Sequence, residues 1–201
     1  MKLNTFKYFY PEKPVLVHRD QELVHRLSEN PDYIGEIKFN GQRLVLHVLD
    51  GVPEFWGRHG EKLTYKPSES VLGVIKEKIP SQGYYVFDGE LRHNKVPGMR
   101  DKIVLWDVFV WNNSTVRLGY DERRELLKSL NLDTDMDSIL HLIGQCEGNF
   151  KETFDRLIAE SDEFEGIVMK NRKGRLNLGR TGAKGSNWMF KIRRTTGRHR
   201  Y

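Results

Sequence analysis

The order of apolar and polar residues predicts short strands interspersed with amphipathic helices. Several runs are rich in β-branched and aromatic residues, and some of them alternate between apolar and polar positions. An Asn-Gly pair at 40–41 separates the first two runs and predicts a β-hairpin there. We predict strands at 33–39, 43–50, 52–58, 83–92, 102–111, 138–145, 164–171 and 187–194.

Apolar side chains spaced three to four residues apart predict helices in four further segments. The first helix ends near Asn30, before a proline. Ser68 or Ser70 is suited to cap the second helix, and Asp121 stands near the start of the third. We predict these helices in the second part of 15–32 and at 68–79, 120–131 and 149–163.

These elements predict an α+β domain of mostly antiparallel sheets with packed helices. No internal repeat, low-complexity tract or Pro/Gly/Ser-rich linker divides the 201 residues, so we expect a single domain over 1–201. The most apolar stretch, 103–111, is interrupted by Asp107 and is far shorter than the roughly 20 residues of a membrane-spanning helix. We therefore expect a cytoplasmic protein, acting as a monomer.

Composition narrows the partners only slightly. The formal net charge of +5 favours anionic partners such as nucleic acid or nucleotides, although so small an excess is also compatible with no such partner. The single cysteine, Cys146, cannot form an internal disulfide, and no cluster of Cys and His predicts a zinc site.

The residues around Lys38 are suited to nucleophilic chemistry. In a strand, Glu36 and Lys38 share one face while Ile37 points to the other. Gly41 allows a ligand to approach the backbone closely, and Arg43 adds a second cation. A nearby cation lowers the pKa of an amine, which favours its nucleophilic form. Taken alone, the segment also fits a surface lysine in a tight hairpin.

Other predicted strands carry charges that suggest ligand contacts. Asp88 and Glu90 bracket a glycine, which suggests a metal or a ribose hydroxyl, or else a bulged strand with solvated carboxylates. In the strand at 164–171, alternation places Glu165 on one face and Lys170 on the other.

In the last predicted strand, Lys191 and Arg193 lie two residues apart and therefore share a face. Two such cations can grip one anionic group from one side. An edge strand with solvated charges shows the same pattern.

The order of these segments is more informative than any one of them. K-x-x-G-x-R begins at Lys38, D-G-E-L at Asp88, E-G-I-V-M-K at Glu165 and W-x-x-K-x-R at Trp188. The series resembles the ordered motifs of the covalent nucleotidyltransferases, a superfamily that contains ATP-dependent DNA ligases, RNA ligases and mRNA-capping guanylyltransferases. The resemblance covers most of the chain.

Three further segments extend the resemblance. W-G-R-H-G at 56–60 resembles the arginine-bearing turn that follows the nucleophile, and L-W-D-V-F at 105–109 resembles the strand whose aromatic residue stacks on the purine. D-E-R-R at 121–124 resembles the helix that follows in DNA ligases. The resemblance implies a nucleotidyltransferase (ATP-grasp-like) fold.

The resemblance also implies the reaction. Lys38 would attack the α-phosphorus of ATP, expel pyrophosphate and carry AMP as a phosphoramidate. AMP would then pass to a 5′-phosphate end of a nucleic acid, and a 3′-hydroxyl would displace it to seal the strand. DNA is favoured over RNA, and the alternatives are an RNA ligase and a GTP-dependent capping guanylyltransferase.

The implied ligand contacts follow from the matched positions. Glu90 and Glu165 would position Mg²⁺ or Mn²⁺, and Glu90 would alternatively bind a ribose hydroxyl. Trp106 would stack on adenine, while the backbone of Glu36 and Ile37 would read the edge of the base. The residues implied to contact phosphates are Arg43, Arg58, Lys170, Lys191 and Arg193; all of these except Arg58 would also lower the pKa of the nucleophile.

Three departures from the family pattern bear on the substrate. Asn40 stands where most DNA ligases and capping enzymes have Asp, and some RNA-joining relatives have Asn there. Arg193 replaces the usual second lysine of the last motif, which keeps the charge but cannot release a proton. About ten residues follow Lys191, too few for the oligonucleotide-binding barrel that usually follows. Arg198 and Arg200 in this tail would contact nucleic acid or remain solvated.

Overall fold

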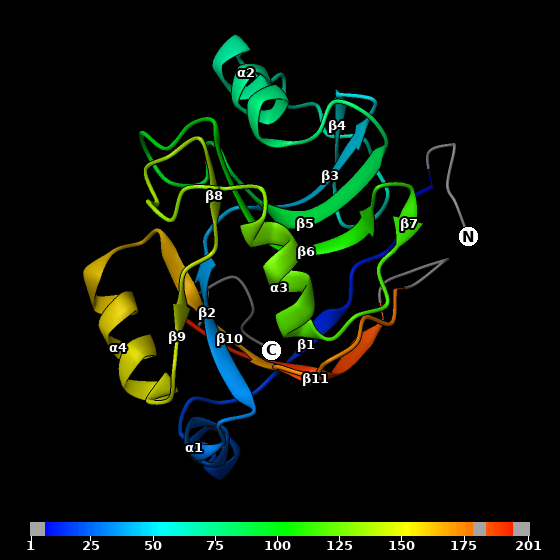
Figure 1. The fold of residues 1–201 in the computed structure, drawn as a ribbon. Helices are drawn as coiled ribbons and strands as arrows, with labels where there is room; N and C mark the ends of the chain where they lie inside the picture. The colour runs from blue at the N-terminus through cyan, green and yellow to red at the C-terminus, as the bar shows by residue number, and fades with distance from the viewer. Residues whose placement is uncertain (1–6, 179–183, 195–201) are drawn as a thin grey trace.

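The computed structural model describes residues 7–178 and 184–194, which form two β-sheets with helices packed against them (Figure 1). One sheet has five strands in the order β1-β11-β10-β2-β9, and the other has the order β4-β3-β5-β6-β7, with β8 paired to β6. The pairs β1–β11 and β6–β8 are parallel, and the other pairs are antiparallel. The predicted α+β class is confirmed. Arg198 and Arg200 lie outside the described residues.

The elements follow the predicted segments closely. The strands are β1 (Lys13–Leu16), β2 (Tyr33–Phe39), β3 (Gln42–Leu49), β4 (Val52–Trp56), β5 (Tyr84–Arg92), β6 (Lys102–Trp111), β7 (Ser114–Thr115), β8 (Leu140–Leu142), β9 (Gln145–Cys146), β10 (Phe164–Asn171) and β11 (Gly185–Arg193). The helices are α1 (Glu22–Glu29), α2 (Glu69–Lys78), α3 (Tyr120–Lys128) and α4 (Phe150–Glu160). The Ser68 hydroxyl, not that of Ser70, accepts the Val71 N–H and caps α2. The predicted strand at 138–145 is divided between β8 and β9, which belong to different sheets.

The predicted hairpin at Asn40 and Gly41 is wrong. β2 pairs with β10 and β9, whereas β3 pairs with β4 and β5 in the other sheet. Neither Asn40 nor Gly41 has the positive φ of a two-residue hairpin turn. The strands separate because their apolar residues are buried in two different cores. The chain therefore crosses from one sheet to the other directly after Phe39, the residue that follows Lys38.

Each sheet has its own apolar core on one face. The five-stranded sheet packs against α1 and α4 through side chains such as Ile167 and Met169. The six-stranded sheet packs against α2 and α3 through side chains such as Leu44 and Phe87. No helix within the described ranges is long and apolar enough to cross a membrane. The opposite faces of the sheets carry smaller apolar clusters, around Phe109 and Trp188, beside the charged side chains that line the space between the sheets.

A bulge before Gly166 changes which side chains of β10 share a face. The register of β10 against β2 shifts between Phe164 and Gly166, so Glu165 is an extra residue on this strand. The prediction that Glu165 and Lys170 point to opposite faces is therefore wrong, and both line one pocket. A Cβ atom at Gly166 would lie 2.0 Å from the Ile192 carbonyl oxygen of β11, so only glycine fits there.

Replacing Gly166 with alanine should destabilise the protein by about 1–3 kcal/mol, because the new methyl group would displace the β11 backbone. Gly73→Ala is the matched control, since a Cβ on this exposed residue of α2 meets nothing within 4 Å. We expect that control to stabilise the protein by about 0.5–1 kcal/mol, because glycine is unfavourable inside helices. Urea unfolding followed by circular dichroism measures both values, and wild-type stability in Gly166→Ala would contradict the close approach.

Candidate active site

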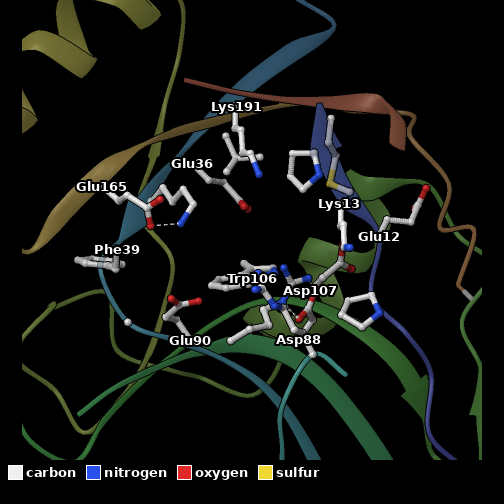
Figure 2. A pocket seen from close by; sticks show the side chains of 18 of the residues that line it. Glu12, Lys13, Glu36, Phe39, Asp88, Glu90, Trp106, Asp107, Glu165 and Lys191 are labelled. Atoms are coloured by element: carbon white, nitrogen blue, oxygen red, sulfur yellow. Dashed lines mark hydrogen bonds and ion pairs between the residues drawn. The ribbon is translucent and has the colours of Figure 1, made fainter. Parts of the chain in front are cut away.

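A pocket of about 580 Å³ lies between the two sheets. Its walls come from β2, β3, β5 and β6, from β10 and β11, and from the segment 11–14 that leads into β1. Figure 2 shows charged side chains of both signs pointing into it. The structure brings all the sequence-predicted site residues to this pocket, namely Glu36, Ile37, Lys38, Arg43, Arg58, Glu90, Trp106, Glu165, Lys170, Lys191 and Arg193.

Glu165 holds the side chain of Lys38. The Lys38 ammonium donates to one oxygen of Glu165, and Arg193 Nη1 donates to the other at 3.3 Å. Burial alone would raise the pKa of Glu165, but the positive charges of Lys38 and Arg193 outweigh burial and hold that pKa below its usual value. Glu165 is therefore an ionised carboxylate that fixes the position of the amine.

Glu90 lies on the opposite sheet from Glu165 and is 7% exposed. Burial raises the pKa of Glu90 to about 7, although the charges of Lys38 and Arg43 act to lower it. The described residues contain no group of three or more His, Cys, Asp or Glu side chains that could hold a metal. A Mg²⁺ ion positioned by Glu90 and Glu165 would take its other ligands from phosphates and water, as Mg²⁺ commonly does.

Arg43 is directed toward the six-stranded sheet. Its guanidinium donates two hydrogen bonds to the carboxylate of Asp88 and lies 4.9 Å from the ring centroid of Trp106. This cation–π contact covers one face of the indole. Arg43 and Asp88 therefore help to fix the ring that the sequence predicts to stack on a purine.

Lys170 pairs with Glu36 inside the protein. Each residue is 3% exposed, and Lys170 Nζ lies 2.6 Å from one oxygen of Glu36. The other oxygen accepts a hydrogen bond from the Tyr120 hydroxyl. Burial and the charge of Glu36 raise the pKa of Tyr120 well above its usual value, so this phenol stays a donor. The charge of Lys170 thus neutralises Glu36, and its contact with phosphate stays a prediction.

Arg58 and Lys191 have no carboxylate partner among the described residues. Burial lowers the pKa of Lys191, and the nearby charges of Lys38 and Arg193 lower it further. An anion bound beside Lys191 would relieve this repulsion between cations. These two side chains are accordingly the best placed of the predicted cations to receive phosphates.

Sequence reasoning did not assign Tyr120, Asp107 or Glu12 to the site. Arg123 donates to both oxygens of Asp107, at 2.6 and 3.0 Å, which ties α3 to β6. Glu12 is 3% exposed and accepts a hydrogen bond from the Trp188 indole at 3.1 Å. Asp107 and Arg123 lie in segments that match the family motifs, so the sequence could have assigned them to the site. Glu12 lies in a segment without any motif.

Two curated relatives match the chain at low identity. It is 24% identical to a DNA ligase of Methanosphaera stadtmanae over 86% of its own length and 35% of that protein. It is 26% identical to the SPbeta prophage-derived DNA ligase-like protein LigB of Bacillus subtilis over 83% of its own length and 64% of that protein. The chain therefore spans about one third and just under two thirds of these relatives. No protein-family model matches it.

Solved structures match the fold more completely. The ligase domain of LigD from M. tuberculosis superimposes with a TM-score of 0.64 at 17% identity, covering 91% of this chain and 59% of that one. The ATP-dependent DNA ligase of bacteriophage T7, in complex with ATP, gives 0.59 at 15% identity and covers 92% and 68%. The fold is that of a covalent nucleotidyltransferase domain. More particularly, it is the fold of the domain that ATP-dependent DNA ligases contain, which confirms the resemblance seen in the sequence.

Replacing Glu90 with glutamine should remove a pH dependence of stability. The folded-state pKa of Glu90, about 7, is higher than the usual 4.5. Its contribution to stability is thus fully present below pH 4.5 and is lost as the pH rises through 7. The difference between these two pKa values corresponds to about 3 kcal/mol in the free energy of unfolding. Between pH 5 and 8, the free energy of unfolding should fall more in the wild type than in Glu90→Gln. Urea unfolding measures this free energy at each pH, and identical pH profiles of the two proteins would contradict the raised pKa of Glu90.

Replacing Lys170 with glutamine should destabilise the protein by about 3 kcal/mol, because the buried Glu36 would lose its nearest cation and keep only Arg124, at 3.9 Å. Lys191→Gln is the matched control. It removes an amine of the same pocket that has no carboxylate partner in the described part of the chain, and we expect a change below about 1 kcal/mol. Urea unfolding of both variants compares the two roles, and equal small effects would show that the Lys170–Glu36 pair matters little.

Proposed function

We propose that this chain is the adenylating domain of an ATP-dependent DNA ligase, with residues 1–201 as one nucleotidyltransferase domain. The observation that carries the proposal is the position of Lys38 at the crossing between the sheets, with Glu165 on one sheet and Glu90 on the other. Relatives named as DNA ligases and the fold of ligase domains bound to ATP support it.

In the first step, the Lys38 amine attacks the α-phosphorus of ATP. The ammonium first loses a proton to water, which frees its electron pair. A nitrogen–phosphorus bond then forms, the bond from the α-phosphorus to its bridging oxygen breaks, and pyrophosphate leaves. A second proton leaves the nitrogen, and AMP remains as a phosphoramidate. Glu165 holds the amine in place before the attack, so little orientation is lost in reaching the transition state.

Several pocket residues would stabilise the charge that develops on the phosphates. Arg58, Lys191 and Arg193 supply cations at the pocket, and Glu90 and Glu165 would hold Mg²⁺ or Mn²⁺. A bound divalent ion withdraws charge from the phosphate oxygens and from the leaving group. The site would therefore combine the fixed cations of its side chains with a divalent metal ion held by carboxylates.

The nucleoside end of the substrate would lie against Trp106, beside the backbone of Glu36 and Ile37. Adenine is the proposed base, because the curated relatives carry DNA-ligase names and the T7 structure contains ATP. A GTP-dependent capping enzyme is the competing assignment. The two differ in which nucleotide labels Lys38.

Later steps would move AMP to a 5′-phosphate end and release it when a 3′-hydroxyl attacks. DNA is the proposed substrate, in repair or replication in the cytoplasm, because both curated relatives are named for DNA. RNA is the second candidate, since Asn40 stands where some RNA-joining enzymes have asparagine. We propose that the domain acts as a monomer.

Replacing Lys38 with alanine should abolish covalent labelling by ATP while leaving the fold intact, because no other lysine in the described part of the chain pairs with Glu165. The protein is incubated with Mg²⁺ and α-labelled ATP or α-labelled GTP, then denatured and separated by size. We expect label from ATP on the wild-type band and none on Lys38→Ala. Lys62→Ala, which alters a surface lysine paired with Glu54, should label normally.

Undiminished label on Lys38→Ala would exclude the proposed nucleophile. Label from GTP alone would assign a capping guanylyltransferase instead. If neither nucleotide labels the wild type, a supplied nick that already carries AMP tests the last step separately, and sealing of that nick would retain the ligase assignment.

A further inference from the structure

One buried arginine takes no part in the site described above. Arg92 follows Glu90 by two residues on β5, and its side chain is 2% exposed. It does not line the pocket. A buried arginine requires a reason, because its five N–H donors and its charge must all be satisfied away from water.

The contacts of Arg92 span the gap between the two sheets. Its guanidinium forms an ion pair with Glu163, which immediately precedes β10 of the other sheet. Arg92 Nη1 donates to the Met136 carbonyl at 3.0 Å. The guanidinium also lies 4.1 Å from the ring centroid of Phe39, the residue that follows Lys38. One side chain thus joins three segments that meet behind the nucleophile.

Arg92 and Glu163 each lie two residues from a carboxylate that lines the pocket. Arg92 lies two residues after Glu90 on β5, and Glu163 lies two residues before Glu165 at the start of β10. The Glu163 carbonyl also accepts the N–H of Asn40 at 2.7 Å, in the crossing segment. A change in the Arg92–Glu163 contact would therefore shift both carboxylates and the crossing together.

Phe39 cannot move away from Arg92 without disturbing its neighbours. Its ring is 2% exposed, with the Phe164 ring centroid at 5.6 Å and that of His141 at 6.1 Å. The guanidinium packs against this ring as a cation–π contact. Because Phe39 is bonded to Lys38, a fixed ring fixes the backbone of the nucleophile.

A buried ion pair is a weak source of stability, since apolar residues of the same size often replace such a pair without loss. Its directional contacts do specify one geometry, as the planar fork of arginine allows. The Arg92 contacts all lie where the two sheets join beside the reacting amine. Their position thus points to orientation of the site.

We propose that Arg92 is a positioning residue for the adenylation of Lys38, which fixes the separation of the two sheets through Glu163 and so holds Glu90 and Glu165 on either side of the amine. We call the Arg92–Glu163 pair the clamp. Its role in adenylation rests on the proposed function, whereas its effect on the environment of Lys38 does not. Arg92 itself touches neither the amine nor the two carboxylates.

The test compares three clamp variants with a neighbouring control. Glu163→Gln keeps the shape of the side chain and removes its charge, Arg92→Gln removes the cation, and Arg92→Lys keeps the charge but loses the planar fork. Asp162→Asn is the control, because it breaks an ion pair one residue away, with Arg194, that stays within one sheet. Glu163 is 31% exposed, so Glu163→Gln provides the test even if Arg92→Gln does not fold.

The first readout is the rate constant of lysyl–AMP formation at saturating ATP. We expect Glu163→Gln and Arg92→Gln to lower it about 10-fold, with the ATP concentration at half-maximal rate changing less than about 2-fold, because misplacement affects the reacting atoms more than binding. Arg92→Lys should recover part of the rate. Asp162→Asn should stay within about 2-fold of the wild type.

The second readout requires no nucleotide. An acetylating reagent modifies free amines, and mass spectrometry gives the rate of modification of Lys38 relative to the exposed Lys128. We expect that relative rate to rise at least about 2-fold in Glu163→Gln, because a looser pair with Glu165 leaves the Lys38 amine free more often. Asp162→Asn should match the wild type.

The outcomes separate the clamp from the proposed function. If folded Glu163→Gln and Arg92→Gln both show the wild-type reactivity of Lys38, the clamp is overturned. If the wild type forms the AMP adduct and Glu163→Gln forms it equally fast, the clamp is again overturned while the function stands. If the wild type forms no adduct and does not seal a nick that already carries AMP, but Lys38 reactivity changes in Glu163→Gln and not in Asp162→Asn, the clamp stands and the function falls.

Discussion

The passage of the chain from one sheet to the other, one residue after Lys38, is the constraint on which the rest of the site depends. A lysine in the middle of one sheet would meet groups from that sheet alone. Lys38 is the last residue but one of β2, beside the crossing, and lines the same pocket as Glu90 on β5 of the other sheet. Each sheet buries its larger apolar core under its own helices, and charged side chains of the opposite faces line the pocket.

The charges of the pocket are arranged as pairs with a few cations left over. Three carboxylates, Asp88, Glu36 and Glu165, each neutralise at least one cation. Such pairs are stable away from water only when both members keep their hydrogen bonds, which fixes their positions. Among the predicted cations, Arg58 and Lys191 have no carboxylate partner in the described residues and are then available to an anionic ligand. The ion pairs thus make the pocket rigid, and these two cations provide affinity for an anion.

Local pattern was enough to place the helices and most of the strands, but it missed β1 and β7 and could not pair the strands. The segments 33–39 and 164–171 match β2 and β10 in their bounds, because alternation is a property of neighbouring residues. The hairpin at 40–41 failed because pairing depends on which core buries each strand. The predicted face of Glu165 was wrong because a bulge inserts one extra residue into a strand, and the alternation of apolar and polar residues does not reveal it.

The members of the site were more predictable than their contacts. The motif series gathered residues as distant as Lys38 and Arg193, since the resemblance carries information about the whole fold. The ion pair of Lys170 with Glu36 and that of Arg92 with Glu163 join positions far apart in the sequence. No local pattern contains such pairs, because the first arises only when β2 and β10 pair within one sheet, and the second only when both sheets are in place.

The parallel pairing of β1 with β11 has a consequence for the order in which this protein assembles. Val15 lies opposite Phe190, so one wall of the pocket joins positions near the two extremes of the sequence. Contacts of such separation form late, because a long loop must close before they contribute. During synthesis on the ribosome, the neighbouring strands β3, β5 and β6 have their partners early, whereas the pocket between the sheets waits for β11 to emerge. A nascent chain would therefore acquire much of its core before this pocket is complete.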